Sequence, residues 1–245
     1  MNILKITLLA IPLFILGSCN SDKSNKAGLD VVFQETTTQF SQIEKQTIEE
    51  NISSAYMEVK ALLPNVPNDI QLIVEIVDWN LNNVGGVTGR TESNSPAVVA
   101  IQISNTFDGG LSSAVEIGLK STLYHEFHHL SRGWAIQDNK FGPGITIAIV
   151  NEGLAEVFAE EYTGAIFEEN HMPEGTDGDS WIKEIMALPK HANYQIWMFE
   201  HPDGRTSIGY RSGNFLVRKI MNESGKNILE LSKLSPIEII KLAGY

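Results

Sequence analysis

The amino-acid sequence predicts an α+β fold in which a small mixed sheet is followed by a mostly helical half. Two runs of β-branched and apolar residues, 70–77 and 97–104, predict strands in the first half. From about residue 111 onward, apolar residues recur at helical spacing over long segments. Hydrophobic residues make up 42% of the 245 positions and charged residues 20%, which indicates a globular chain able to bury a core without disulfides.

The first half is expected to contain one helix, two strands and a glycine-rich connection. Helical spacing predicts a helix within 38–63, which ends before a proline. The strand at 70–77 is followed by 84–90, which has too many glycines for the interior of a regular element and is interpreted as a loop or bulge. The second strand, 97–104, leads through a short glycine turn into the helical half.

The second half is expected to be helical throughout. Helices are predicted at 112–131 and 145–163, separated by a segment with glycine and proline. A third is expected near 179–199, interrupted at its proline, and a fourth at 206–222. A short last helix begins with Ser235 as its N-cap, because a serine hydroxyl accepts from the first turn and the following proline fits there.

The N-terminus has the features of an export signal. An apolar run at 6–16 follows one lysine and is too short for a transmembrane helix. It ends in Leu16-Gly17-Ser18-Cys19, which resembles the lipobox of bacterial lipoproteins, where the signal is cut before a cysteine that carries lipid. Cys19 is the only cysteine of the chain. The alternative is an ordinary signal peptide that leaves an unpaired thiol.

The lipoprotein interpretation divides the chain into three parts. Residues 1–18 are the signal peptide, 19–28 a polar, flexible tether, and 29–245 a single folded domain. The protein is then expected in the bacterial cell envelope, exported and anchored to a membrane by acyl chains on Cys19. The sequence leaves open which membrane leaflet holds the anchor and what the oligomeric state is.

The charge of the chain argues against nucleic acid as a partner. The net charge is −12, from 18 basic and 30 acidic residues. Phosphate backbones are bound by clusters of Lys and Arg, and the sequence contains no such cluster.

One segment carries a pattern with a chemical meaning, His125-Glu126-Phe127-His128-His129. His125 and His129 are four residues apart, so on a helix both imidazoles lie on one face and can bind one metal ion. Glu126 can hold a water at that metal and act as its general base, which completes the pattern H-E-x-x-H of zinc hydrolases. His128 points about 100° around the helix from His129, so it is expected to be structural or to donate a hydrogen bond to a ligand residue, and not to bind the metal itself.

Catalytic zinc takes three protein ligands and keeps one position for water, so a third ligand must come from elsewhere. No further histidine follows closely enough to serve. Glu152 and Glu156 lie one turn apart on the next predicted helix, in the segment Asn151-Glu152-Gly153-Leu154-Ala155-Glu156. Either carboxylate is a candidate ligand on spacing alone.

These two segments together resemble the gluzincin pattern of thermolysin-like enzymes, H-E-x-x-H followed by N-E-x-x-x-D on a second helix. The resemblance implies that Glu152 is the third zinc ligand and that Glu156 orients a ligand histidine. Glu156 departs from the pattern, which has the shorter Asp there. A closer resemblance is to the YjaZ-like family of predicted bacterial zinc proteases, through the H-E-F-H-H segment, the E-G-L-A-E segment and Gly209-Tyr210-Arg211-Ser212-Gly213. It covers roughly residues 70–225.

The resemblance implies a zincin-like metallopeptidase fold with one Zn²⁺ and a peptide or protein substrate. Glu126 is expected to be the general base, and Tyr210 is the first candidate for stabilising the transition state. His201 and Arg205 are further candidates. In zincins an edge strand of the sheet pairs with an extended peptide, and 97–104 is expected to be that strand.

Two other functions compete with an active peptidase. One is a zincin-fold lipoprotein that binds a partner and no longer cleaves it, and the other is a zinc amidase acting on a non-peptide bond. The presence of Glu126 favours an active enzyme, because a binding module has no need of a base.

Overall fold

The computed structural model describes residues 25–26, 28–34 and 38–245. The predicted signal peptide, 1–18, and Cys19 lie outside the described residues. Residues 25–26, inside the predicted tether, form a short strand that pairs with the next one. Within the described ranges, no helix combines the length and the apolar character that a membrane span requires.

The sheet has five strands in the order β1-β2-β3-β5-β4. The strands β2, β3 and β5 are parallel, whereas β1 and β4 run antiparallel to their neighbours, so the sheet is mixed. Buried and partly exposed residues alternate along β3, which is the pattern of a strand with one face on a core. The strands are β1 (Asn25–Lys26), β2 (Leu29–Gln34), β3 (Ile70–Val77), β4 (Val87–Asn94) and β5 (Ala97–Ser104).

The structure corrects two expectations about this sheet. Much of the segment 84–90, predicted as a loop or bulge, belongs to β4, which starts at Val87. Gly85 and Gly86 do form a turn with positive φ, but the third glycine, Gly89, continues as a strand. The predicted edge strand, 97–104, is β5 and lies between β3 and β4, because the chain folds back as an antiparallel hairpin that puts β4 at the edge.

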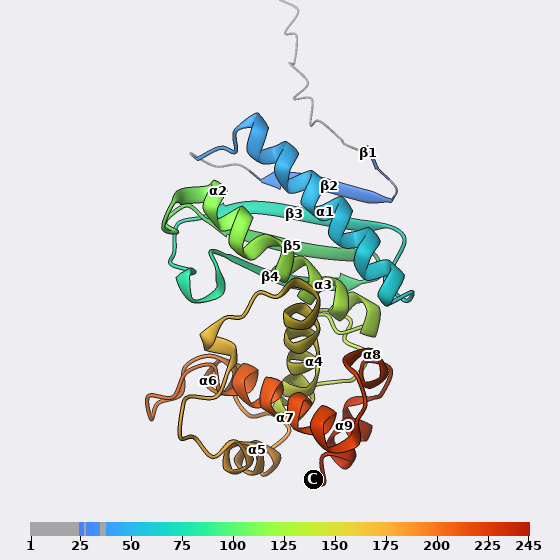
Figure 1. Ribbon diagram of the computed structural model, residues 1–245, viewed down its shortest axis with the longest axis vertical. Helices are drawn as coiled ribbons and strands as arrows, with labels where there is room; N and C mark the ends of the chain where they lie inside the picture. The colour runs from blue at the N-terminus through green and yellow to red at the C-terminus, as the bar shows by residue number, and fades with distance from the viewer. Residues whose placement is uncertain (1–24, 27, 35–37) are drawn as a thin grey trace, which may run out of the picture.

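Helices cover one face of the sheet. The helix α1 (Gln42–Leu62) begins at Ser41, whose side chain forms a capping box with Glu44. A second long helical run, 110–132, consists of α2 (Gly110–Ala114), a π turn η2 (Val115–Leu119) and α3 (Lys120–Arg132). Figure 1 shows α1 and this run side by side in front of the strands, and their contacts agree.

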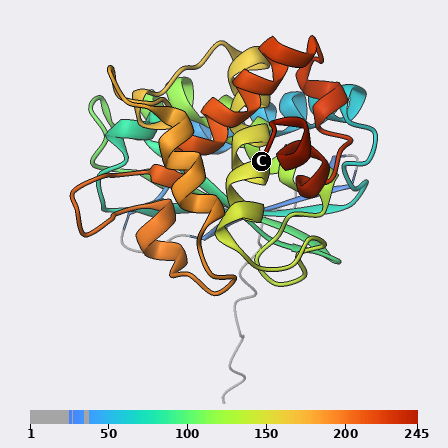
Figure 2. The same ribbon diagram turned by 90° about the horizontal axis from the view of Figure 1, so that it is seen from below.

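The remaining helices form the second half, below the sheet in Figure 1. The prediction of an α+β fold with a sheet followed by a helical half is confirmed. Figure 2 views this half end-on and shows the C-terminal residues beside α4, which contacts both α8 and α9. The predicted third helix is two short ones, and Ser235 caps the last helix as expected. The helices are α4 (Ile145–Thr163), α5 (Gly178–Met186), α6 (Tyr194–Met198), α7 (Ile208–Ser224), α8 (Ile228–Leu231) and α9 (Pro236–Leu242), with the turns η1 (Asn82–Val84) and η3 (Glu168–Asn170) in the connections.

In the helical half, α4 and α7 pack closely against each other at two glycines. A Cβ atom at Gly153 would lie 2.2 Å from the backbone of Gly213, and one at Gly213 would lie 2.2 Å from the carbonyl oxygen of Ile149. Both positions therefore require glycine, because a side chain would push two backbones apart. This contact fixes α4, the helix that carries the acidic residues of interest.

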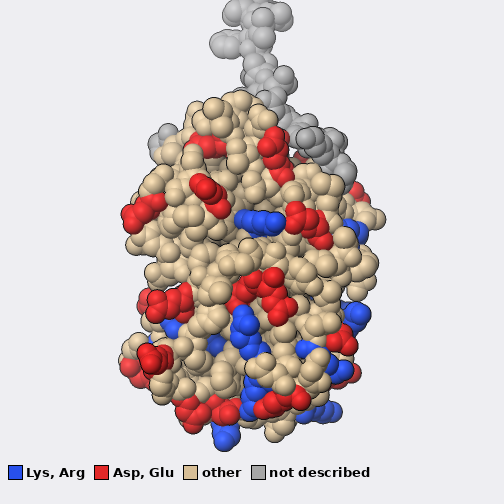
Figure 3. Space-filling view, viewed as in Figure 1, with Lys and Arg blue, Asp and Glu red and all other residues tan. Residues whose placement is uncertain are grey.

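Charged side chains are mixed on the face shown in Figure 3. Carboxylates are spread over it, and Lys and Arg lie singly or in small groups between them. That face has no broad basic surface of the kind that binds phosphate backbones.

Replacing Gly153 by alanine is expected to lower the free energy of unfolding by about 1–3 kcal/mol or more, because the added methyl group overpacks a contact between backbones. Urea unfolding followed by circular dichroism measures this. The control is Glu161→Ala, an exposed position on the same helix, which should change stability by less than about 0.5 kcal/mol. Equal stability of Gly153→Ala and wild type would contradict the packing described.

Candidate metal centre

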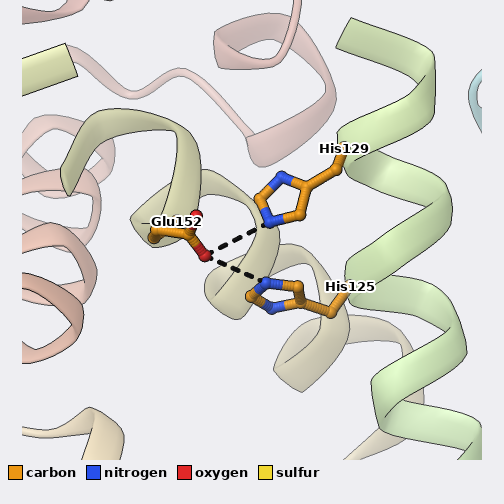
Figure 4. Close-up of side chains that lie close together, drawn as sticks. All are labelled: His125, His129 and Glu152. Atoms are coloured by element: carbon orange, nitrogen blue, oxygen red, sulfur yellow. Dashed lines mark hydrogen bonds and ion pairs between the residues drawn. The ribbon is translucent and has the colours of Figure 1, made fainter. Parts of the chain in front are cut away.

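The helix α3 presents two histidines to α4. His125 and His129 lie on the same face, one turn apart. The helix ends at Gly133, whose φ of 77° lets the chain turn away from the helix axis. The chain then returns as α4, which packs against α3 and places Glu152 opposite both imidazoles (Figure 4).

The three side chains converge on one point. Nε2 of His125 and Nε2 of His129 each lie 3.2 Å from the same oxygen, Oε2 of Glu152. All three ligand atoms lie within 4.8 Å of one another, and the group is buried. In a tetrahedral site with Zn–N distances of about 2.0–2.1 Å, neighbouring ligand atoms are about 3.3 Å apart, so both measured separations fit zinc. Two imidazoles and one carboxylate are also a known ligand set of catalytic zinc.

The charge state of the carboxylate suits a cation. Burial by itself raises the pKa of Glu152, but the charges and hydrogen bonds of His129 and His125 lower that pKa well below its ordinary value. Glu152 is therefore ionised at neutral pH, which is the form that binds metal.

A second glutamate holds the outer side of one histidine. Glu156 lies one turn after Glu152 on α4, and its Oε1 is 3.1 Å from Nδ1 of His125. The other oxygen of Glu156 accepts a hydrogen bond from the side-chain amide of Asn170, in η3. The carboxylate is thus fixed from two directions and in turn fixes the orientation of the His125 ring.

The third ligand residue has a holding partner as well. The indole N–H of Trp134 donates to Oε1 of Glu152 at 2.8 Å, so the oxygen that faces away from the histidines is occupied. This leaves Oε2 to face the two imidazoles. The Nδ1 atom of His129 is buried and has no hydrogen-bond partner among the described residues.

Glu126 lies beside the three residues on the side of the sheet. It is 3% exposed, and Oγ1 of Thr91, on β4, donates to its Oε2 at 2.8 Å. A Cβ atom at Gly89 would come within 2.6–2.9 Å of the Glu126 side chain, so the strand needs glycine there to leave room for the carboxyl group. Burial raises the pKa of Glu126, which makes its carboxylate a better proton acceptor.

A cleft of about 920 Å³ opens over these residues, between the edge strand β4 and the helical half. His125, Glu126, His129 and Glu152 line it, and so do Tyr210 of α7 and Tyr194 of α6. Burial, followed by the negative charge of Glu152, raises the pKa of Tyr210 well above its ordinary value, so its hydroxyl stays protonated and can donate.

Two further histidines and one arginine singled out in the sequence, His128, His201 and Arg205, lie apart from the cleft. His128 points away, with Nε2 2.8 Å from Oγ of Ser232, and burial lowers its pKa, so it is a neutral, structural residue. His201 pairs with Asp203 at 2.8 Å, and Arg205 pairs with Glu184. Neither His201 nor Arg205 lines the cleft.

Several residues of the centre were not found from the sequence. These residues contact the site from other parts of the chain, namely Gly89, Thr91, Trp134, Asn170 and Tyr194. None belongs to a motif with fixed spacing. Gly89 belongs to the glycine-rich segment 84–90, which the sequence predicts as a loop or bulge.

A buried pair of imidazoles and a carboxylate, next to a buried glutamate in an open cleft, defines a candidate zinc centre of the hydrolase kind. The family described as "Predicted Zn-dependent protease (DUF2268)" matches residues 111–241, more than half of the chain, and includes every one of these four residues. The chain belongs to this family. No curated protein and no solved structure matches it.

Removing the indole donor with Trp134→Phe is expected to weaken zinc affinity about 10–100-fold, because the carboxylate of Glu152 loses the partner that orients it. Competition with a chromophoric chelator measures the affinity. Trp79→Phe, at a side chain that is 49% exposed, is the control and should bind zinc like wild type. If Trp134→Phe binds zinc as tightly as the control, the indole has no part in holding the ligand.

Proposed function

We propose that this protein is a metallopeptidase of the gluzincin kind, similar to the YjaZ-like proteins, with one zinc ion held by His125, His129 and Glu152. The observation that carries the proposal is the convergence of these three ligand atoms beside the buried carboxylate of Glu126, at the floor of a cleft. The family description supports zinc and proteolysis at a general level.

The proposed reaction is the hydrolysis of a peptide bond. A bound zinc ion would supply Lewis acidity, which lowers the pKa of a water molecule and polarises a carbonyl group. Glu126 takes the proton of the attacking water and later delivers it to the nitrogen of the leaving amine. Thr91 keeps the Glu126 carboxylate directed at the cleft through its 2.8 Å hydrogen bond.

Two further residues assist this chemistry. Glu156 holds the ring of His125 through its Nδ1 atom, which keeps Nε2 directed at the metal position. Tyr210 lines the cleft with a protonated hydroxyl and donates a hydrogen bond to the negative charge that develops on the carbonyl oxygen. The substrate is a peptide or protein segment in extended form, and the edge strand near it is β4.

The location is proposed from the N-terminal sequence. Leu16-Gly17-Ser18-Cys19 supports an exported bacterial lipoprotein of the cell envelope, in which Cys19 carries the acyl chains that hold the enzyme at a membrane.

Replacing the base with Glu126→Gln should keep one zinc ion per chain and reduce turnover of a peptide library at least about 100-fold, the lower range for loss of a general base. Metal analysis and mass spectrometry of the library measure the two quantities. Wild type that binds zinc but cleaves no peptide would support a binding module or an amidase instead. Wild type that binds no zinc would refute the proposal.

The two α4 glutamates, Glu152 and Glu156, are expected to contribute unequally to zinc affinity. Glu152→Gln removes a ligand and is expected to cost far more zinc affinity than Glu156→Gln, which should weaken binding about 10–100-fold through the His125 ring. Chelator competition on both variants, with Glu161→Gln as the control on the same helix, measures the order. The reverse order would make Glu156 the ligand.

The membrane anchor has its own test. Cys19→Ser, expressed in a bacterial host with the complete signal, should move the protein from the membrane to the soluble envelope fraction and abolish labelling by a fatty-acid analogue. Retention in the membrane without labelling would contradict an anchor on Cys19.

A further inference from the structure

The edge of the sheet that borders the cleft is largely occupied by the chain itself. The amide of Ser104 donates to the carbonyl of Gly86 at 2.9 Å, and this bond shows which residues of β4 direct their backbone groups toward β5. Since the backbone groups of an antiparallel strand point alternately to its two sides, Val87, Gly89 and Thr91 of β4 direct theirs away from β5 and toward the cleft. These three residues are therefore the ones that can pair with an incoming peptide.

At one end of this edge, the segment 136–138 takes the place of a partner strand. The amide of Ile136 donates to the carbonyl of Thr91, and the amide of Gln137 donates to the carbonyl of Glu92, each at 3.0 Å. Asp138 accepts from the amides of Asn94, the last residue of β4, and of Ser95 in the turn that follows. An extended peptide lying on β4 therefore cannot pair with the strand past Thr91.

Only a short stretch of the edge is left. The hydroxyl of Thr122 already donates to the carbonyl of Val87 at 3.3 Å. Of the three edge residues of the described strand, Gly89 is the one whose carbonyl no other group uses. Gly89 also lies against Glu126, so this open carbonyl is next to the proposed base.

The charges around the cleft indicate which end of a peptide fits the closed side. Apart from the three metal-binding residues, Glu126 and the tyrosines Tyr194 and Tyr210, the charged or ionisable side chains that line the cleft are Arg90, Lys190 and His191. Lys190 is exposed and forms no ion pair within the described part of the chain, and its backbone carbonyl lies near Gly144 in the loop that follows the 136–138 segment. A free amino terminus would need a spare carboxylate here, and the lining offers none beyond Glu126 and Glu152.

We propose that the enzyme is a carboxypeptidase that removes one or two residues from the carboxyl end of a peptide, an inference that rests on the peptidase function proposed above. The peptide pairs with Gly89, its last residues lie against the segment 134–138, and Lys190 binds the terminal carboxylate. In the reaction, the oxygen of water bonds to the carbonyl carbon and the C–N bond breaks. The proton passes through Glu126 to the leaving nitrogen, which gives a shortened peptide and a free amino acid or dipeptide.

Three versions of one peptide test the proposal on the full, zinc-loaded protein: the free acid, its C-terminal amide, and its N-acetylated form. Mass spectrometry over time identifies the products. The free acid and the N-acetylated peptide should lose one or two C-terminal residues at the same rate, and the amide should react at least about tenfold more slowly, which corresponds to about 1.4 kcal/mol.

The role of the lysine is tested on the same peptides. Lys190→Gln should raise KM for the free acid about tenfold and so reduce the difference in rate between the free acid and the amide. Lys183→Gln, at an exposed lysine of α5 that does not line the cleft, should behave like wild type.

The outcomes separate the two levels of the proposal. Internal cleavage at equal rates for acid and amide, or loss of cleavage on N-acetylation, would overturn the carboxypeptidase inference while leaving the peptidase function in place. If the zinc-loaded protein cleaves none of the three peptides or any library member, the peptidase function itself fails.

Discussion

The shared carboxylate oxygen of Glu152 is the contact on which the rest of the molecule depends. It lies 3.2 Å from an imidazole nitrogen of His125 and of His129, and so joins the helix over the sheet to the first helix of the other half. A buried carboxylate without cationic partners would be costly, so α3 and α4 must stay in register for the fold to be stable. The same contacts therefore determine both the position of the metal centre and the packing of α4 against α3.

The helix α4 carries further carboxylates that need partners along the same face. Glu152, Glu156 and Glu160 are four residues apart, and each has its own set of partners. Glu156 is held by His125 and by the amide of Asn170. Glu160, which is 6% exposed, is bound by the side chains of Arg218, Asn214 and His171. Two of these groups, those of Asn214 and Arg218, lie on α7. The close packing of α7 on α4 at their glycines therefore also brings hydrogen-bond donors to the buried carboxylate of Glu160.

The sequence was sufficient wherever periodicity and local chemistry decide the structure. The spacing of His125 and His129, the cap at Ser235 and the β-branched run of β3 all act within one element, and the structure agrees with each. The edge strand was missed because Gly89 is set by a distant side chain, that of Glu126, and not by its neighbours in the chain. Trp134 and Asn170 were missed for the same reason, since their partners lie on α4.

The segment 136–138 also affects whether other protein chains can associate with the edge of the sheet. An uncovered edge strand offers a row of unpaired amides and carbonyls on which a second chain can add a strand and begin to aggregate. Because Ile136 and Gln137 already pair with β4, the edge beside the cleft presents little such template. The loop that shapes the cleft thus also protects the sheet from association with other unfolded or extended chains.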